Sequence, residues 1–166
     1  MQNANIGYVG RGDGMKMRAA FPQLDLVLIA LMVLCVATVA SAAEIGQIKI
    51  SRGQVTVERD GRVLPGPVGT RLQTADTVKT GADGSIGITM DDDSLLSAGP
   101  NSVLSLDRYA FDPTTNRGRF DASLNKGTLA VISGRIAKES PDAMTVRTPT
   151  AVLGVRGTEF AVSVND

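Results

Sequence analysis

The chain has 166 residues, with 17 Lys plus Arg balanced by 17 Asp plus Glu, so its formal net charge is zero. The charges are spread along the chain without a basic block, so the chain lacks the charge pattern typical of proteins that bind nucleic acid or an anionic membrane surface. Histidine is absent and Cys35 is the single cysteine. Since these side chains supply most bases and nucleophiles, we predict no catalytic residues, no metal ligands and no cofactor.

Residues 26–39 form an uncharged apolar run that follows two basic residues and precedes the small-residue triplet Ala40-Ser41-Ala42. A basic segment, an apolar run and a small-x-small site are the parts of an export signal. We therefore expect residues 1–43 to be an export signal. The mature chain, residues 44–166, is expected to be periplasmic or secreted.

The same segment could instead remain as an inner-membrane anchor. As a helix, residues 26–43 would span about 27 Å, near the lower limit for crossing a bilayer. A lipid anchor is disfavoured, because Leu34 stands before Cys35 where a lipoprotein signal has a small residue. Contact with a membrane is thus expected only if the segment is not removed.

The mature chain is long enough for one hydrophobic core, and its residue pattern predicts a single all-β domain. It begins with two alternating runs, residues 45–49 and 54–58, the second of which places Val55 and Val57 on one buried face. The pair Asp60-Gly61 tolerates the positive φ angles of a type I′ hairpin turn.

After the hairpin, Pro65-Gly66-Pro67 belongs in a loop or an edge strand, because proline lacks the N–H that a central strand needs. Further short strands are expected at residues 77–80, 85–90, 94–98, 103–106, 120–124, 128–132, 144–148 and 159–164. Their spacing is typical of antiparallel strands in a sandwich, a roll or a short solenoid-like stack.

Residues 107–119 contain Pro113, Asn116 and Gly118 and are predicted to form a long exposed loop. Loops on a rigid sheet commonly carry binding residues. Tyr109 and Arg117 are therefore candidates for a binding surface.

Asp91-Asp92-Asp93 is the principal carboxylate cluster, followed by Ser94. Calcium prefers several oxygen ligands on a flexible turn, so a cation site is one interpretation. The preferred interpretation is a solvated hairpin turn, because consecutive side chains point in different directions and no glutamate completes an EF-hand loop.

Three sequence motifs follow one another in a recognisable order. They are Thr80-Gly81-Ala82-Asp83-Gly84, then Asp93-Ser94 with Gly99-Pro100-Asn101-Ser102, and finally Val155-Arg156-Gly157-Thr158-Glu159-Phe160. Their order and spacing resemble the FecR domain family over residues 45–164. The resemblance implies a structural role for the shared positions Gly81, Asp93, Gly99, Pro100, Gly157, Thr158 and Phe160.

The closing motif has two interpretations. Arg156 and Glu159 could form a polar binding patch. The preferred interpretation is structural: Gly157 permits a bend, Thr158 bonds locally and Phe160 fills the core.

The resemblance implies a non-catalytic periplasmic module that binds or senses. In iron-uptake regulators of this family, a cytoplasmic N-terminal domain holds a sigma factor and the periplasmic part receives a receptor's signal. At most 25 residues precede the apolar run here, too few for such a domain. We therefore expect the module alone, with an envelope protein or a cell-wall polymer as its partner.

Two alternatives from other classes remain. The first is a structural or assembly component that pairs through an exposed sheet edge. The second is a carboxylate-dependent glycan hydrolase built from an Asp/Glu pair that folding brings together.

Overall fold

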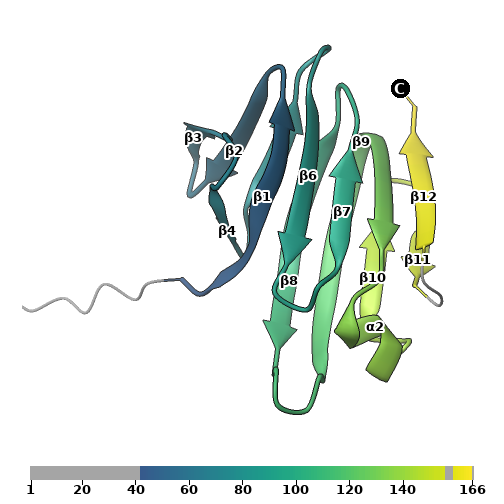
Figure 1. The fold of residues 1–166 in the computed structure, drawn as a ribbon. Coiled ribbons are helices and arrows are strands. Elements are labelled where there is room, and N and C mark those ends of the chain that lie inside the picture. Colours follow the sequence, from purple (N-terminus) through teal and green to yellow (C-terminus); the bar gives the residue numbers. More distant parts are fainter. Residues whose placement is uncertain (1–41, 156–158, 166) are drawn as a thin grey trace, which may run out of the picture. The chain divides into compact units, whose positions relative to one another are not determined.

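The computed structural model describes residues 42–155 and 159–165. These residues form one all-β domain, as the sequence predicts, and the domain is an open sheet that curls into a half-barrel (Figure 1). The predicted export signal lies outside the described residues. In the part of the chain that is described, no helix is long and apolar enough to cross a membrane.

One part of the curled sheet, the front layer, has the strand order β4-β1-β6-β7-β9-β12, and every neighbouring pair is antiparallel. Strands β1, β6 and β7 face the viewer in Figure 1. The strands are β1 (Glu44–Arg52), β4 (Arg71–Gln73), β6 (Ser85–Met90), β7 (Leu95–Ala98), the C-terminal half of β9 (Gly118–Ile132) and β12 (Glu159–Val164).

The other part, the back layer, has the order β3-β2-β5-β8-β9-β10-β11. Its strands are β2 (Val55–Arg59), β3 (Arg62–Pro65), β5 (Thr77–Thr80), β8 (Val103–Phe111), the N-terminal half of β9, β10 (Met144–Arg147) and β11 (Val152–Gly154). Strand β10 runs parallel to β9, whereas the other neighbours in this layer are antiparallel.

Strand β9 joins the two layers. Its first half pairs with β8 and β10, and its second half pairs with β7 and β12. The strand turns over near Gly127, whose φ of 87° is in the region that favours glycine. The sequence predicted two separate strands here, and the structure joins them through this corner. The short helix α2 (Arg135–Glu139) then precedes β10.

The core lies between the layers, because alternation along each strand sends apolar side chains inward. Val55 and Val57 are buried as predicted. Phe160 packs against the core but is only partly buried, so its predicted place inside the core holds in part. The largest fully buried side chains are Ile48, Leu72, Ile86, Ile88, Met90, Leu96, Leu104, Leu106, Phe120, Leu124, Leu129 and Ile136.

The prediction of a long loop over residues 107–119 is wrong. Strand β8 continues to Phe111 and β9 begins at Gly118, so only residues 112–117 connect them. A bulge between Ser105 and Arg108 interrupts the ladder and breaks the alternation that would have revealed the longer strand. The Asp112 carboxylate accepts hydrogen bonds from Thr115 and Thr114, which lowers the pKa of Asp112.

The predicted hairpin turn is present, since Asp60 and Gly61 have φ angles of 51° and 72°. Pro65 lies in β3, which pairs only with β2 among the described strands, as expected of an edge position. The sequence patterns missed β4, β11 and α2, which have three, three and five residues. Elements this short carry too few side chains to show a period.

Candidate functional site

The turn between β6 and β7 contains the three successive aspartates. Asp93 has a φ of 66° and donates its N–H to the carbonyl of Met90 at 3.0 Å. Asp91 and Asp93 are exposed, but Asp92 has no exposed surface. The prediction of a solvated turn is therefore wrong for Asp92, which points inward because the chain offers it a set of donors.

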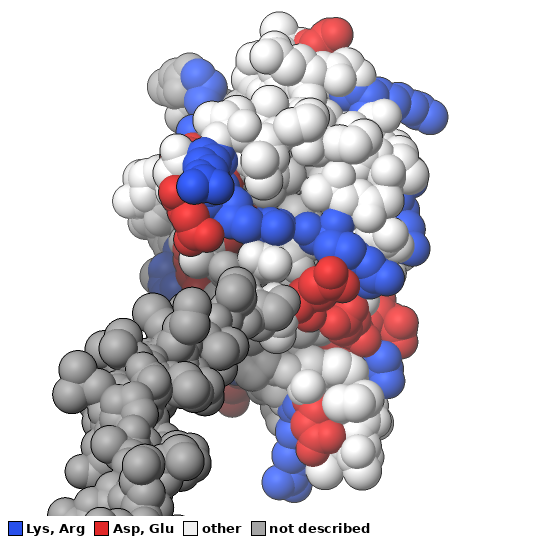
Figure 2. All heavy atoms as spheres, turned by 90° about the vertical axis from the view of Figure 1, so that its left-hand side faces the viewer, with Lys and Arg blue, Asp and Glu red and all other residues white. Residues whose placement is uncertain are grey.

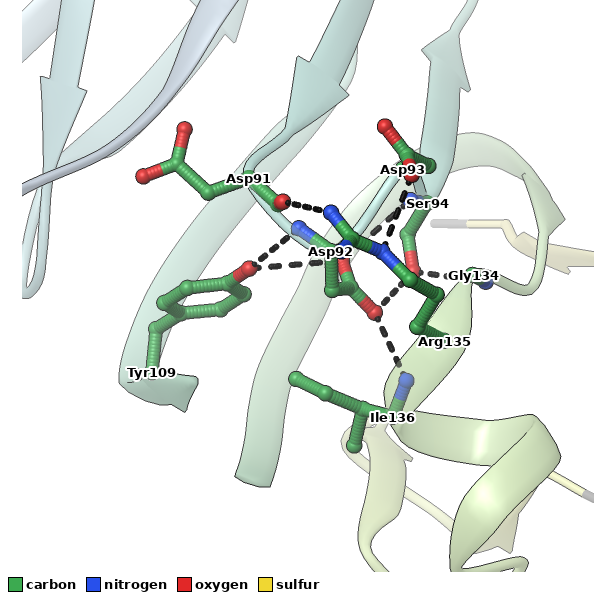
Figure 3. Close-up of polar contacts among 8 residues, drawn as sticks. All are labelled: Asp91, Asp92, Asp93, Ser94, Tyr109, Gly134, Arg135 and Ile136. Atoms are coloured by element: carbon green, nitrogen blue, oxygen red, sulfur yellow. Dashed lines mark hydrogen bonds and ion pairs between the residues drawn. The ribbon is translucent and has the colours of Figure 1, made fainter. Parts of the chain in front are cut away.

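Those donors come from three separate parts of the chain (Figure 3). The Ser94 hydroxyl donates to Asp92 Oδ2 at 2.8 Å, and the backbone N–H of Ile136 donates to the same oxygen at 3.3 Å. The Tyr109 hydroxyl donates to Asp92 Oδ1 at 3.3 Å. Backbone groups add to this, because Asp92 N–H donates to the Tyr109 oxygen at 2.8 Å and the Asp92 carbonyl accepts from Arg135 N–H at 2.7 Å.

Tyr109 connects this cluster to the core. Its ring meets Phe120 edge-on, with centroids 5.6 Å apart and an interplanar angle of 73°. Burial raises the pKa of Tyr109, and the nearby carboxylates of Asp92 and Asp91 raise it further. The phenol therefore stays neutral near neutral pH and is unsuited to act as a general base.

Arg135 covers the cluster at the start of α2. Its guanidinium lies 4.7 Å from the ring centroid of Phe111 and donates to the Asp91 carbonyl at 2.8 Å. Its Nε is 3.0 Å from Asp93 Oδ2, an ion pair whose angle is too bent for a hydrogen bond. We call these residues, Asp91 to Ser94 with Tyr109, Arg135 and Ile136, the Asp92 cluster.

The Asp92 cluster is suited to holding the fold together. Asp92 is bonded to its own turn, to β8 and to the first residues of α2. Across the described ranges, no group of three or more His, Cys, Asp or Glu side chains is placed to hold a metal ion. A carboxylate already bonded by donors of the chain has little capacity left for a substrate or a cation.

A second polar cluster lies among the turns at the other end of the strands. The Thr80 hydroxyl donates to the Gly99 carbonyl at 2.7 Å and accepts from Ser102 N–H at 2.8 Å. Thr80 and Ser102 are both buried. The carbonyl of Gly81 accepts from Asn101 N–H at 3.0 Å, so two sequence motifs 20 residues apart interlock. A Cβ on Gly99 would lie 2.5 Å from Thr128 Oγ1, so a larger residue there would require the Thr128 side chain to move.

Buried carboxylates of the back layer are also paired within the chain. Asp76 is fully buried and accepts from Arg59 Nε at 2.8 Å and Nη2 at 2.7 Å. Asp121, 2% exposed, accepts from Arg119 Nε at 2.8 Å and lies 3.9 Å from Arg108. Figure 2 shows the side on the left of Figure 1, where charges of both signs lie beside one another.

The outward side of the front layer has a different character. Two adjoining hollows of about 410 and 340 Å³ lie on it and share Ser97 and Ala130 as lining residues. Most of the other lining residues are apolar or small. Lys49 and Glu159 are charged residues that line the smaller hollow together with Ile50, Leu95 and Ile132.

Comparison with known protein families shows which family the chain belongs to. A family model described as FecR protein matches residues 76–166, more than half of the sequence. The chain belongs to the FecR family. This family acts in sensing and signal transduction and is regulatory. Searches of curated proteins and of solved structures found no match.

The FecR match begins at the buried Asp76 and includes both polar clusters. Gly81, Gly99 and Pro100 lie in the interlocked turns, where Ser102 Oγ donates to the Pro100 carbonyl at 3.4 Å. Asp93 lies in the turn of the Asp92 cluster. In this FecR domain, the first two motifs from which the resemblance was inferred are thus turns that fix the ends of strands.

The predicted binding-surface residues are in different environments. Tyr109 points into the Asp92 cluster, Arg117 is exposed in the β8–β9 turn, and Glu159 is exposed at the start of β12. The structure gives no contact that joins these three residues. Arg156, Gly157 and Thr158 lie outside the described residues, so their predicted roles stay predictions.

Sequence reasoning missed the residues at the centres of the two polar clusters in this FecR domain. Nothing in the pattern Asp-Asp-Asp-Ser distinguishes the buried Asp92 from its exposed neighbours, because its partners Tyr109 and Ile136 are 17 and 44 residues away. Thr80 carried a usable signal. It is the last residue of a strand, at an inward-facing position, and it precedes a glycine turn.

Proposed function

We propose that the chain is a non-catalytic binding and sensing module on the periplasmic side of the bacterial envelope, with an envelope protein as its partner. Membership of the FecR family is the observation that carries the proposal, because the family acts in signal transduction. The export signal predicted at residues 1–43 supports the location.

The use of polar groups inside the domain is consistent with this function. Asp76, Asp92 and Asp121 are buried and each is bonded by donors of the same chain. Their carboxylates therefore stabilise the fold, and recognition falls to the surface. A rigid sheet with exposed strands is a suitable scaffold for protein recognition.

The proposal is tested by purifying the tagged full chain from osmotic-shock fluid and from washed membranes, followed by pull-down from envelope extract. We expect the chain in the periplasmic fraction with its first residue at Ala43 or Glu44, bound to a protein that protease treatment of the extract removes. Capture that survives protease but is lost after glycan digestion would favour a cell-wall polymer. Release of soluble sugars from cell-wall glycan would instead support the hydrolase.

A second candidate is assembly through strand addition, because β12 pairs with β9 along Glu159 to Val164 and with no other described strand. An edge strand of this kind presents unpaired backbone groups that an extended segment can bind.

Two proline variants test this route and control for one another. Adjacent residues of β12 direct their N–H groups to opposite sides, one toward β9 and the next toward the open edge. Of the two variants Ala161→Pro and Val162→Pro, one therefore removes a hydrogen bond to β9. The other removes an N–H from the open edge, where an added strand would pair. Thermal melts identify the variant that stays folded. Strand addition predicts that this variant loses the partner, and full retention by it would exclude that route.

A further inference from the structure

The outward side of the front layer carries a surface that is uncharged over most of its area and partly apolar. Three large side chains on it are incompletely covered, with 51% of Ile50, 43% of Leu95 and 45% of Ile132 exposed. We call this surface the front patch, defined by Ile50, Gly87, Leu95, Ser97, Ala130, Ile132 and Ala161.

Strand register arranges the small residues of the front patch in a row across four strands. Gly87 is opposite Ser97, Ser97 is opposite Ala130, and Ala130 is opposite Ala161. Ile50 is opposite Gly87 and closes the row at the β1 end. The row therefore has a bulky side chain at one end and an alanine at the other.

A neighbouring row is made of larger side chains. Leu95 is opposite both Thr89 and Ile132, and Ile132 is opposite Glu159. This row forms a ridge beside the row of small residues. A ridge next to a trough can fit a copy of itself, provided that the two surfaces meet in the correct orientation.

The charges at the two ends of the front patch indicate such an orientation. Lys49 on β1 and Glu159 on β12 line the same hollow from opposite sides. Four strand spacings separate them, about 19 Å. Opposite charges on opposite sides of an otherwise uncharged face suit pairing with a rotated copy.

We propose that the front patch is the interface of a two-fold symmetric dimer of this chain, in which two front layers stack face to face. A two-fold axis parallel to β7 places β1 of one copy over β12 of the other. Lys49 then meets the partner's Glu159, and Ile50 lies over the partner's Ala161. Leu95, on the central strand, meets its own counterpart.

The area of the front patch determines how strongly the two copies are expected to associate. Five strands at about 4.8 Å and five residues at about 3.3 Å give a face of about 400 Å² on each copy. Stable interfaces bury about 800 Å² on each partner, so a weak and reversible dimer is expected. The proposal does not depend on the envelope partner, because it concerns contact between identical chains.

Charge exchange in the purified chain tests the proposal by sedimentation analysis over concentrations up to high micromolar. Lys49→Glu or Glu159→Lys alone replaces two attractions in the dimer by two repulsions, so the dissociation constant should rise about tenfold. The double exchange should restore the original value. Arg62→Glu on β3 is the matched control and should leave association unchanged.

A change at the centre of the patch gives an independent check. Ser97→Arg adds a long charged side chain where the two copies meet, so it should abolish association while the melting temperature stays near that of the parent. A chain that remains monomeric at every accessible concentration would overturn the proposal. Dimers that survive both single exchanges and Ser97→Arg would also overturn it and would place self-association elsewhere.

Discussion

Replacing Asp92 by alanine tests whether the Asp92 cluster holds the fold together. Asp92→Ala removes the acceptor of four hydrogen bonds, from Ser94 N–H, Ser94 hydroxyl, Ile136 N–H and Tyr109 hydroxyl. The two hydroxyls can reorient, but the two N–H groups are fixed by the backbone. Each buried donor left without an acceptor costs about 1–3 kcal/mol.

The expected loss of unfolding free energy is therefore about 3–5 kcal/mol, the range found when one partner of a buried charged network is removed. This is a large fraction of the roughly 5–15 kcal/mol that stabilises a typical domain. At about 4 °C per kcal/mol for a domain of this size, the melting temperature should fall by about 12–20 °C.

The assay is a urea melt together with a thermal melt, compared with Asp91→Ala as the matched control. Asp91 is the exposed neighbour, and Arg135 donates its hydrogen bond to the backbone carbonyl of Asp91, which the substitution keeps. Loss of the Asp91 side chain should therefore lower the unfolding free energy by less than about 0.5 kcal/mol. If Asp92→Ala and Asp91→Ala melt alike, the structural role assigned to the cluster is refuted.

Three further results are expected. Because the pKa of Tyr109 is raised in the folded state, the contribution of Tyr109 to stability is complete below pH about 10 and declines at higher pH. Urea melts from pH 8 to 11 should show this decline in unfolding free energy, and Tyr109→Phe should make the decline smaller. Trypsin should cleave first after Arg117 in the β8–β9 turn, and mass analysis showing first cleavage after Arg108 within β8 would contradict the strand assignment. Phe160→Ala should cost about 2 kcal/mol in a denaturant melt, below the roughly 3–5 kcal/mol of a fully buried phenylalanine, because Phe160 is partly buried.

Alternation predicted most strands because one face of each strand is buried. Residues 85–90 show this clearly, since Ile86, Ile88 and Met90 face inward and the residues between them face outward. The signal failed where the backbone departs from a regular ladder. The bulge before Arg108 concealed the second half of β8, and the corner at Gly127 divided β9 into two apparent strands.

The polar clusters could not be predicted for a different reason. A buried Asp92 depends on donors that folding brings from β8 and α2, and the sequence near Asp92 holds no trace of them. The family resemblance pointed to the correct turns without giving their contacts. Thr80 and Ser102 lie in the recognised motifs, but their mutual hydrogen bond appears only in three dimensions.

Photo-crosslinking in intact cells tests the proposed function most directly. A photoreactive residue placed at Ser163, exposed on edge strand β12 and outside the front patch, is compared with one at Lys79, which is exposed on β5 of the back layer. The proposal, with the partner bound along β12, predicts an adduct with an envelope protein from Ser163, identified by mass spectrometry, and none from Lys79. Adducts with identical chains only, or with no protein from either position, would contradict an envelope protein as the partner of this FecR domain.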